Sequence, residues 1–402
     1  MSTITQGKRY DANDRGEDVF SAVGENLSYY FASPGQTWIG EGIRESITIP
    51  WNKQSAAELQ NTLAWRLAPS ELAVGALPFE RDADVALFVP ETLRCMLPAA
   101  EFVRSLLIPP VTHTIEECRS DPACFLEGVE QALMLIEQGA LSKIVLSRAL
   151  DLKLDREVAL AAVLKRLTQQ NRSGYTYALQ LPFREGEQTP RTLFGASPEL
   201  LISRHGNHVT SNPLAGSLPR TGCPIQDQRR ATALLASDKD RREHAIVVAA
   251  VEEALRPYCA SLVVPAQPSV VFTDSMMHLS TRIAGTLTRP HVSTLELVYA
   301  LHPTPAVCGY PTEPARRAIK ALEPFDRGAF TGAIGWLDAK GNGEWAVTIR
   351  CAESAGRALR LFAGAGIVAG STPQQELAET SSKLRTMLVA LGVEQLLEEV
   401  WR

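Results

Sequence analysis

A glutamate stands in the apolar stripe of a predicted helix that begins near Ser237, a suitable N-cap. At helical spacing Glu243 shares a face with Val247, Val251 and Ala254. A carboxylate on such a face must be ion-paired, protonated or bound to a metal, because an isolated buried charge is costly. The pattern leaves two interpretations open, an ordinary buried ion pair and a metal site.

A second set of charges lies on a predicted helix near the C-terminus. Thr372–Pro373 and a following glutamine have the pattern of a capping-box start, with proline at the first helical position. Glu376, Glu379 and Lys383 then recur at spacings of three and four on one face. An exposed ladder of ion pairs is one interpretation. The other is that a glutamate from this helix joins Glu243 to hold Mg²⁺, which binds through few carboxylates, waters and an anionic substrate.

Two ionisable residues stand in strand-like segments. In KIVLSRAL the side chains of Lys143, Val145 and Ser147 share one face, so the lysine either reaches solvent at the strand end or points into a cavity. Glu199 lies between the turn-like GASP and the apolar LLI. It is either an exposed residue at a strand edge or a pocket carboxyl that burial keeps protonated. The buried alternatives would supply a general base and a general acid.

Three further segments could bind an anion. The glycines of GAGIV, residues 364–368, allow backbone N–H groups to approach a ligand, as does the tight turn of PLAGS, residues 213–217. Arg350 ends AVTIR and is either a surface arginine or a bidentate clamp for a carboxylate. No GxSxG, GxxxxGK or HExxH motif is present, so the usual hydrolase, nucleotide and zinc-protease sites lack support.

The elements that must position these residues alternate irregularly between strands and helices. Strands are predicted at 46–51, 85–90 and 143–154, a hairpin around GNG, and a glycine-broken strand in RLFAGAGIVAGS. Helices are predicted after a turn in EECRSDPACF up to a C-cap at Gly139, over 158–171, from Ser237, through ARRAIKAL and from about Pro373. This order predicts an α+β fold with large, mainly antiparallel sheets. Without a linker or an internal repeat, residues 1–402 are expected to form one domain.

Composition narrows the class of protein further. The 402 residues carry a net charge of −5, which argues against a nucleic-acid partner. No apolar run is long enough to span a membrane, and the polar N-terminus does not resemble a signal peptide. The seven cysteines are scattered without a CxxC motif, so neither a zinc site nor a disulfide framework is expected. A cytoplasmic location is the simplest expectation.

Ten segments in a fixed order carry a family resemblance. They are KIVLSRAL, FGASPELL, NPLAGSLPR, SDKDRREH, MMHLSTRIAG, LHPTPAVCGYP, EPFDRGAFTGAIGW, GNGEWAVTIRCA, LFAGAGIV and ELAETSSKL. Together they resemble the chorismate-utilising enzymes, and most closely the isochorismate synthases of the siderophore type. The resemblance covers about residues 140–390, and residues 1–125 add little. It implies the fold of anthranilate synthase component I, with two packed sheets flanked by helices and an active site in a central cleft.

The same resemblance implies a role for single residues. Lys143 is expected to be the general base that activates water, and Glu199 the general acid that protonates the leaving hydroxyl. Glu243 and Glu379, with Glu376 close by, are expected to bind Mg²⁺. The residues expected to clamp the substrate carboxylate or to line the pocket are Ala215, Gly216, Ser217, His278, Ala306, Arg350, Gly364, Gly366 and Lys383.

The implied reaction is the Mg²⁺-dependent isomerisation of chorismate to isochorismate, a first step towards 2,3-dihydroxybenzoate and a catechol siderophore such as enterobactin. Water adds at ring carbon 2 on the side of Lys143, and the hydroxyl leaves carbon 4 on the side of Glu199. The lysine must then be neutral and the glutamate protonated. A downstream isochorismatase is expected to consume the product, and the chain is expected to be a monomer.

Two positions separate the related activities. Relatives that use ammonia usually carry glutamine in place of Lys143. Salicylate synthases share the lysine but often carry threonine in place of Ala306 and go on to eliminate pyruvate. Ala306 therefore favours an enzyme that stops at isochorismate. A salicylate synthase, a menaquinone-pathway isochorismate synthase and a non-catalytic chorismate-binding subunit remain alternatives.

Overall fold

The computed structural model describes residues 19–20, 23–24, 26–81, 83–103, 112–183, 186 and 188–396. Within them the strands form three sheets in which every pairing is antiparallel. The ten-stranded sheet contains β1 (Leu27–Ala32), β2 (Thr37–Glu41), β6 (Thr92–Met96), β7 (Ile115–Ser120), β8 (Lys143–Leu154), β9 (Tyr175–Leu181), β10 (Arg191–Ser197), β18 (Gly309–Tyr310), β21 (Cys351–Ala355) and β22 (Ala358–Ile367). The nine-stranded sheet contains β3 (Glu45–Ile47), β4 (Leu72–Leu77), β5 (Ala86–Val89), β11 (Leu200–His205), β12 (His208–Asn212), β14 (Cys259–Val263), β17 (Ile283–Leu287), β19 (Ala333–Asp338) and β20 (Gly343–Val347).

The third sheet is small and consists of β13 (Leu214–Pro219), β15 (Ser269–Phe272) and β16 (Met276–Ser280). The helices in the described part of the chain are α1 (Lys53–Arg66), α2 (Ala99–Phe102), α3 (Pro122–Glu137), α4 (Leu160–Gln170), α5 (Pro224–Ala236), α6 (Asp238–Leu255), α7 (Thr294–Leu301), α8 (Thr312–Leu322) and α9 (Pro373–Leu391). Two short 3₁₀ turns follow α6 and α9, at Arg256–Tyr258 and Glu394–Leu396.

The two large sheets pack face to face. Their shared core is rich in aromatic side chains, among them Tyr29, Phe31 and Tyr177 from one sheet and Phe88 and Trp336 from the other. Successive side chains of a strand point to opposite faces, so Tyr29 and Phe31 enter this shared core whereas Tyr30 packs in the core on the other face, under the helices. Strands from the first hundred residues enter both large sheets, beside strands from the rest of the chain.

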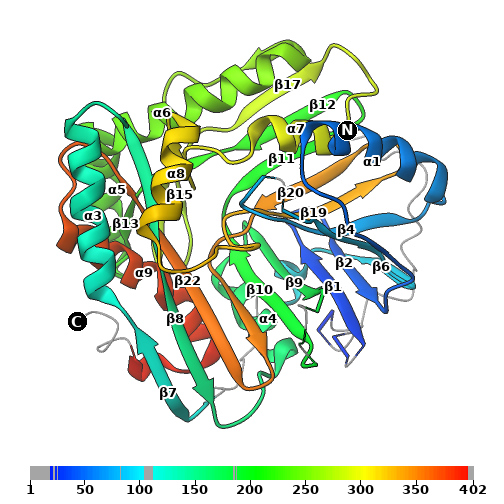
Figure 1. The fold of residues 1–402 in the computed structure, drawn as a ribbon, viewed down its shortest axis with the longest axis horizontal. Coiled ribbons are helices and arrows are strands. Elements are labelled where there is room, and N and C mark those ends of the chain that lie inside the picture. Colours follow the sequence, from blue (N-terminus) through cyan, green and yellow to red (C-terminus); the bar gives the residue numbers. More distant parts are fainter. Residues whose placement is uncertain are drawn as a thin grey trace.

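Helices cover the outer faces of the sandwich. The helices α4 and α9 pack on one sheet through residues such as Leu164 and Leu388, whereas α1 and α7 pack on the other through Leu63 and Leu295. Figure 1 shows α3 and α9 on one side of the molecule and α1 on the opposite side. The predicted α+β fold with two packed antiparallel sheets and flanking helices is confirmed, and the small third sheet is an addition to it.

Several predicted elements match the structure closely. The strand over 143–154 has its predicted bounds, and Ser237 caps α6 by accepting a hydrogen bond from the backbone N–H of Asp240. Gly139 follows α3 with a φ of +72°, the left-handed conformation expected of a glycine at a helix end. None of the seven cysteines forms a disulfide. No helix in the ranges that the structure describes is long and apolar enough to cross a membrane.

Other predictions about elements were wrong. The expected turn before α3 is the strand β7, an exposed and charged edge strand without an apolar pattern. The strand at 46–51 ends at Ile47, since Pro50 cannot donate a backbone hydrogen bond and makes only an isolated bridge. The helices α5 and α7 were not predicted. Thr372 is the N-cap of α9 but its side chain makes no capping hydrogen bond, so there is no capping box.

Two corrections concern the predicted site. The strand β22 is not broken at its glycines, because it pairs with β8 without interruption from Ala358 to Ile367. The second strand of the predicted hairpin divides into β20 and β21, which belong to different sheets. Arg350 lies in the crossing between them with a φ of +52°, and not at the end of a strand.

Candidate active site

One cavity gathers nearly all of the predicted residues. It has a volume of about 60 Å³ and is lined by β8 and β22 of the ten-stranded sheet, by β13 and β16, by α6 and α9, and by connecting segments. The predicted residues in its wall are Glu199, Ala215, Gly216, Ser217, Glu243, His278, Ala306, Arg350, Gly364, Gly366, Glu379 and Lys383. Lys143 and Glu376 do not line the cavity, and each lies behind its wall in contact with another charged residue.

Lys143 is fully buried at the start of β8, so it is not a surface lysine. Its Nζ atom lies 2.9 Å from Oε1 of Glu243, which is itself mostly buried and reaches the cavity from α6. The glutamate on the apolar stripe is therefore ion-paired in the structure. Gly366 makes room for the pair, because a Cβ atom there would stand 2.2 Å from Oε1 of Glu243 and 3.2 Å from Cε of Lys143.

Of the two glutamates of α9, Glu376 is buried and Glu379 is half-buried, so the interpretation as an exposed ion-pair ladder is wrong. Glu376 is 1 % exposed, and its Oε1 accepts a hydrogen bond of 3.0 Å from Nζ of Lys239. Burial, with the charge of Glu379 beside it, raises the pKa of Glu376 to about 6. Burial also acts to raise the pKa of Glu379, but Lys383, Lys239 and the Ser217 hydroxyl together lower it overall.

The three carboxylates suit a divalent cation by their chemistry. Glu243 and Glu379 line the same cavity, and Oε2 of Glu376 is buried without a hydrogen-bond partner among the described residues. Oxygen ligands of this kind suit Mg²⁺, which needs only one or two carboxylates beside waters and substrate. No three His, Cys, Asp or Glu side chains converge on one point in the part of the chain that the structure describes. Each carboxylate is instead ion-paired with a lysine, namely Lys143, Lys239 or Lys383.

Glu199 lines the same cavity from the connection between β10 and β11, and it is 3 % exposed. Its Oε1 accepts a hydrogen bond of 3.4 Å from the backbone N–H of Leu214. Burial raises the pKa of Glu199 to about 7, although Leu214, Lys143, Arg350 and Lys383 act in the opposite direction. The carboxyl is therefore able to hold a proton near neutral pH, as a general acid must.

A cationic group faces Glu199 from the crossing between β20 and β21. Arg350 is 9 % exposed, and its Nη2 lies 3.4 Å from Nε2 of His278. Burial and the neighbouring Arg350 and Lys383 hold the pKa of His278 well below its usual value, so the imidazole is neutral. Burial lowers the pKa of Arg350 to about 10, which still leaves it charged. The guanidinium lines the cavity and can bind an anion there.

The segment of PLAGS contributes backbone groups. The pairing of β13 with β16 shifts register between Ala215 and Ser217, and Gly216 at this bulge has a φ of +73°. A Cβ atom at Gly216 would stand 3.0 Å from Cβ of Asp240, so both conformation and space require glycine. Lys383 from α9 donates a hydrogen bond of 2.7 Å to the carbonyl oxygen of Gly364. This bond joins α9 to β22 in the cavity wall.

Several wall residues were not predicted from the sequence. Val145, Val307, Phe330 and Phe362 supply apolar surface, and the rings of the last two stack with centroids 4.7 Å apart. Thr331 also lines the cavity, with a φ of +60° that is rare for a β-branched residue. None of these residues has an ionisable side chain, so nothing in the sequence marked them as candidates for a site. Two wall residues other than glycine, Thr331 and Arg350, have a positive φ. Such backbone strain often marks functional sites, but it is visible only in the structure and not in the sequence.

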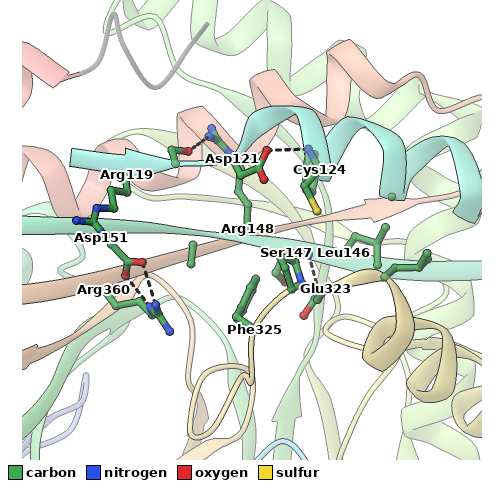
Figure 2. A pocket seen from close by; sticks show the side chains of 16 residues that line it. Arg119, Asp121, Cys124, Leu146, Ser147, Arg148, Asp151, Glu323, Phe325 and Arg360 are labelled. Atoms are coloured by element: carbon green, nitrogen blue, oxygen red, sulfur yellow. Dashed lines mark hydrogen bonds and ion pairs between the residues drawn. The ribbon is translucent and has the colours of Figure 1, made fainter.

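A second and larger cavity, of about 240 Å³, lies near the start of α3 and contains none of the predicted residues. Figure 2 shows its wall, in which Asp121 caps α3 through the backbone N–H of Cys124 and Arg360 pairs with Asp151. Its polar groups are mostly engaged with one another. The smaller cavity is therefore the better candidate for the active site. Its wall holds Glu199, Glu243 and Glu379, and Lys143 lies behind the wall against Glu243.

Comparison with known proteins gives a consistent picture. The family model described as chorismate binding enzyme matches residues 99–392. Isochorismate synthase DhbC of Bacillus subtilis is 48 % identical over 377 residues, which cover 92 % of this chain and 94 % of the relative. The vibriobactin-specific isochorismate synthase of Vibrio cholerae is 41 % identical, over 91 % of this chain and 92 % of the relative. Among solved structures, a putative 2,3-dihydroxybenzoate-specific isochorismate synthase, DhbC from Bacillus anthracis, aligns with a TM-score of 0.87 at 48 % identity, over 93 % of this chain and 98 % of that one.

Proposed function

The chain belongs to the chorismate-binding enzyme family, and we propose that it is an isochorismate synthase. In this reaction water forms a bond to ring carbon 2 of chorismate, the ring double bonds shift, and the bond from carbon 4 to its hydroxyl breaks. The observation that carries the proposal is a buried glutamate in the cavity wall that can hold a proton near neutral pH, with a buried lysine behind the wall in contact with the lining residue Glu243. One water enters and one leaves, so substrate and product have the same composition.

Glu199 is the proposed acid. Its raised pKa, about 7, lets it carry a proton to the departing hydroxyl, which leaves as water. The ionised carboxylate that remains after the transfer lies near Lys143, Arg350 and Lys383, whose charges favour it. The same cations that oppose protonation in the resting site thus stabilise Glu199 after it has acted as an acid.

Lys143 is the proposed base that takes a proton from the incoming water. Its Nζ atom contacts Glu243, and Glu243 lines the cavity in which the substrate would bind. The amine therefore lies directly behind the cavity wall. Gly366 keeps this approach open. Glutamine would be unable to accept the proton in the same way, which agrees with its presence in relatives that use ammonia.

The substrate is a dianion, and the proposed site supplies cationic and N–H donors for it. Arg350 offers a planar pair of donors suited to a carboxylate, and Lys383 lines the same cavity. Glu243, Glu379 and Glu376 are the proposed ligands of Mg²⁺. When bound, the cation would draw electron density from the ring carboxylate and so favour water addition.

We also propose that the product enters the route to 2,3-dihydroxybenzoate and a catechol siderophore. The names of two relatives, specific for vibriobactin and for 2,3-dihydroxybenzoate, support this over a menaquinone route. Ala306 lines the cavity where salicylate synthases often carry threonine, and its small side chain supports an enzyme that does not eliminate pyruvate.

The test is a product analysis. Purified protein is incubated with chorismate and Mg²⁺ without ammonia, and the products are separated by chromatography. We expect isochorismate in equilibrium with chorismate, with no product from the same protein in excess chelator. Salicylate and pyruvate as the main products would replace the proposal with the elimination activity. A folded protein that leaves chorismate unchanged would overturn it.

A further inference from the structure

Arg327 and Glu323 form an ion pair that is almost completely buried, with side-chain exposures of 2 % and 3 %. Both lie in the connection between α8 and β19, within the segment EPFDRGAFTGAIGW, and neither was assigned a role from the sequence. A guanidinium carries five N–H donors, and here each one has an acceptor. Nε and Nη2 donate to the two oxygens of Glu323, Nη1 donates to Val307 and Thr331, and Nη2 also donates to Val145.

Three of these acceptors belong to residues that line the candidate active site. The carbonyl oxygen of Val145 lies 2.8 Å from Nη2, that of Val307 lies 2.7 Å from Nη1, and Oγ1 of Thr331 lies 3.2 Å from Nη1. The guanidinium carbon is also 5.8 Å from the ring centroid of Phe330, another wall residue. One side chain outside the cavity therefore contacts three separate segments of its wall.

Glu323 extends the network to the strand that carries Lys143. The backbone N–H of Ser147 donates to Oε1 of Glu323 over 2.7 Å, as Figure 2 shows from the side of the larger cavity. On this edge β8 pairs with β18 at its first two residues and with β7 from Leu150 onwards. On this edge, among the described residues, no strand pairs with residues 145–149, although the backbone N–H of Val145 donates to the carbonyl oxygen of Cys308. The strand β22 pairs with these residues on the other edge. The side chains of Glu323 and Arg327 take the place of a strand on the first edge.

The backbone of Thr331, in this part of the wall, is held in a conformation that is unfavourable for threonine. A φ of +60° is unfavourable for threonine and persists only where the surroundings fix it. Here Arg327 holds the hydroxyl, and the backbone N–H of Thr331 donates to the carbonyl oxygen of Thr348 over 2.7 Å. Thr348 stands two residues before Arg350, so the network ends next to the proposed carboxylate clamp.

We infer that Arg327, fixed by Glu323, is a positioning residue of the proposed isomerase reaction, an inference that rests on the proposed function. It sets the distance between the strand that carries Lys143, the segment that carries Ala306 and Val307, and the segment of Phe330 and Thr331. The substrate ring must fit between these segments for water to meet carbon 2 in line with Lys143. A misplacement of about 1 Å can cost about 100-fold in rate.

The test is Arg327→Lys, which keeps the positive charge but cannot reach five acceptors from one plane. Arg204→Lys is the matched control, because Arg204 is equally buried and donates to the carbonyl oxygens of Gly206, Lys340 and Pro290, away from the cavity. The rate is expressed per folded molecule, from the native fraction in near-ultraviolet circular dichroism. We expect kcat of Arg327→Lys to fall about 10- to 100-fold with KM for chorismate within threefold, and Arg204→Lys to keep both within threefold.

The inference is overturned if Arg327→Lys keeps a near-normal kcat per folded molecule, or if Arg204→Lys loses as much. Should Arg327→Lys fail to fold, Glu323→Gln decides, since it weakens the hold on Arg327 and keeps an oxygen for Ser147. A normal kcat in folded Glu323→Gln then overturns the inference, and a fall of tenfold or more supports it. The wild-type reaction is the common control. If the wild-type protein makes no isochorismate, the proposed function is rejected. If the wild type is active and Arg327→Lys is unaffected, only the positioning role is rejected.

Discussion

Nζ of Lys143 lies 2.9 Å from Oε1 of Glu243, so the proposed base and a proposed cation ligand share one buried ion pair. The pair neutralises two charges that would each be costly to bury alone. It also places the two functions in competition, because the Glu243 carboxylate cannot hold Nζ of Lys143 and a divalent cation equally at the same time. The site is built around this contact, and Gly366 is the residue that permits it.

Gly366→Ala is expected to abolish turnover. A Cβ atom would stand 2.2 Å from Oε1 of Glu243, so the carboxylate or the strand must move. We expect kcat/KM to fall at least 100-fold while the protein remains folded by circular dichroism. Gly128→Ala is the control, since its Cβ would meet Cδ1 of Leu146 at an ordinary 3.4 Å and alanine favours a helix. Full activity in Gly366→Ala would show that the pair need not form.

Lys143→Gln is expected to lose water addition with little loss of structure. Glutamine retains a polar group beside Glu243, whereas alanine would leave a buried carboxylate without its partner at a cost of about 3–5 kcal/mol. Loss of a general base lowers kcat by about 10²–10⁴-fold. Isochorismate formation is measured by chromatography alongside thermal unfolding. Turnover near the wild-type rate in the folded variant would remove Lys143 as the base.

The secondary structure was predictable where the periodicity and capping residues of a segment favour the same element that the segment forms in the folded protein. The alternating strand over 143–154 and the capped helix from Ser237 follow from periodicity and capping, and both are observed. The strand β7 was missed because its sequence, IEECRS, is polar and its order comes from pairing with β8. The glycines of β22 were interpreted as breaks, although they make room for side chains from other elements.

The ionisable residues that line the candidate site could be singled out in the sequence, whereas the residues that hold them could not. A carboxylate on an apolar stripe is visible in the sequence, so Glu243 could be singled out. Glu323 and Arg327 stand four apart with opposite charges, which in a sequence is indistinguishable from an ordinary surface pair. Only the packing of α8 and β8 around them buries the pair. The partner of Glu243 was equally invisible, since Lys143 lies 100 residues away along the chain.

Glu243→Gln is expected to weaken Mg²⁺ binding at least tenfold. The amide oxygen can still accept from Lys143, but the variant lacks the negative charge that a divalent cation requires. Binding is measured by calorimetric titration of Mg²⁺ into protein freed of metal with a chelator. Glu252→Gln is the matched control on the same helix, where the carboxylate pairs with Arg256 at the surface. Equal Mg²⁺ affinity in the two variants and the wild type would place the cation elsewhere.

The acid role of Glu199 predicts a loss of activity as the pH rises. Its pKa is raised to about 7, so the fraction that holds a proton decreases tenfold per pH unit above that value. We expect kcat/KM to fall with a slope approaching −1 in a logarithmic plot above about pH 7. A profile that stays flat from pH 6 to pH 9 would exclude Glu199 as the general acid.

The same pKa shift predicts how the folding stability depends on pH. The folded protein holds the proton of Glu199 up to about pH 7, whereas the unfolded chain releases it near 4.5, so between these values the folded state binds more protons. The contribution is therefore fully present below about pH 4.5 and is lost as the pH rises through about 7, by about 3 kcal/mol in total. Glu199→Gln is neutral throughout and lacks this change. Urea unfolding of both proteins at pH 5 and pH 8 measures it: we expect the wild type to lose more stability than the variant, and equal losses would mean that Glu199 ionises normally in the folded protein.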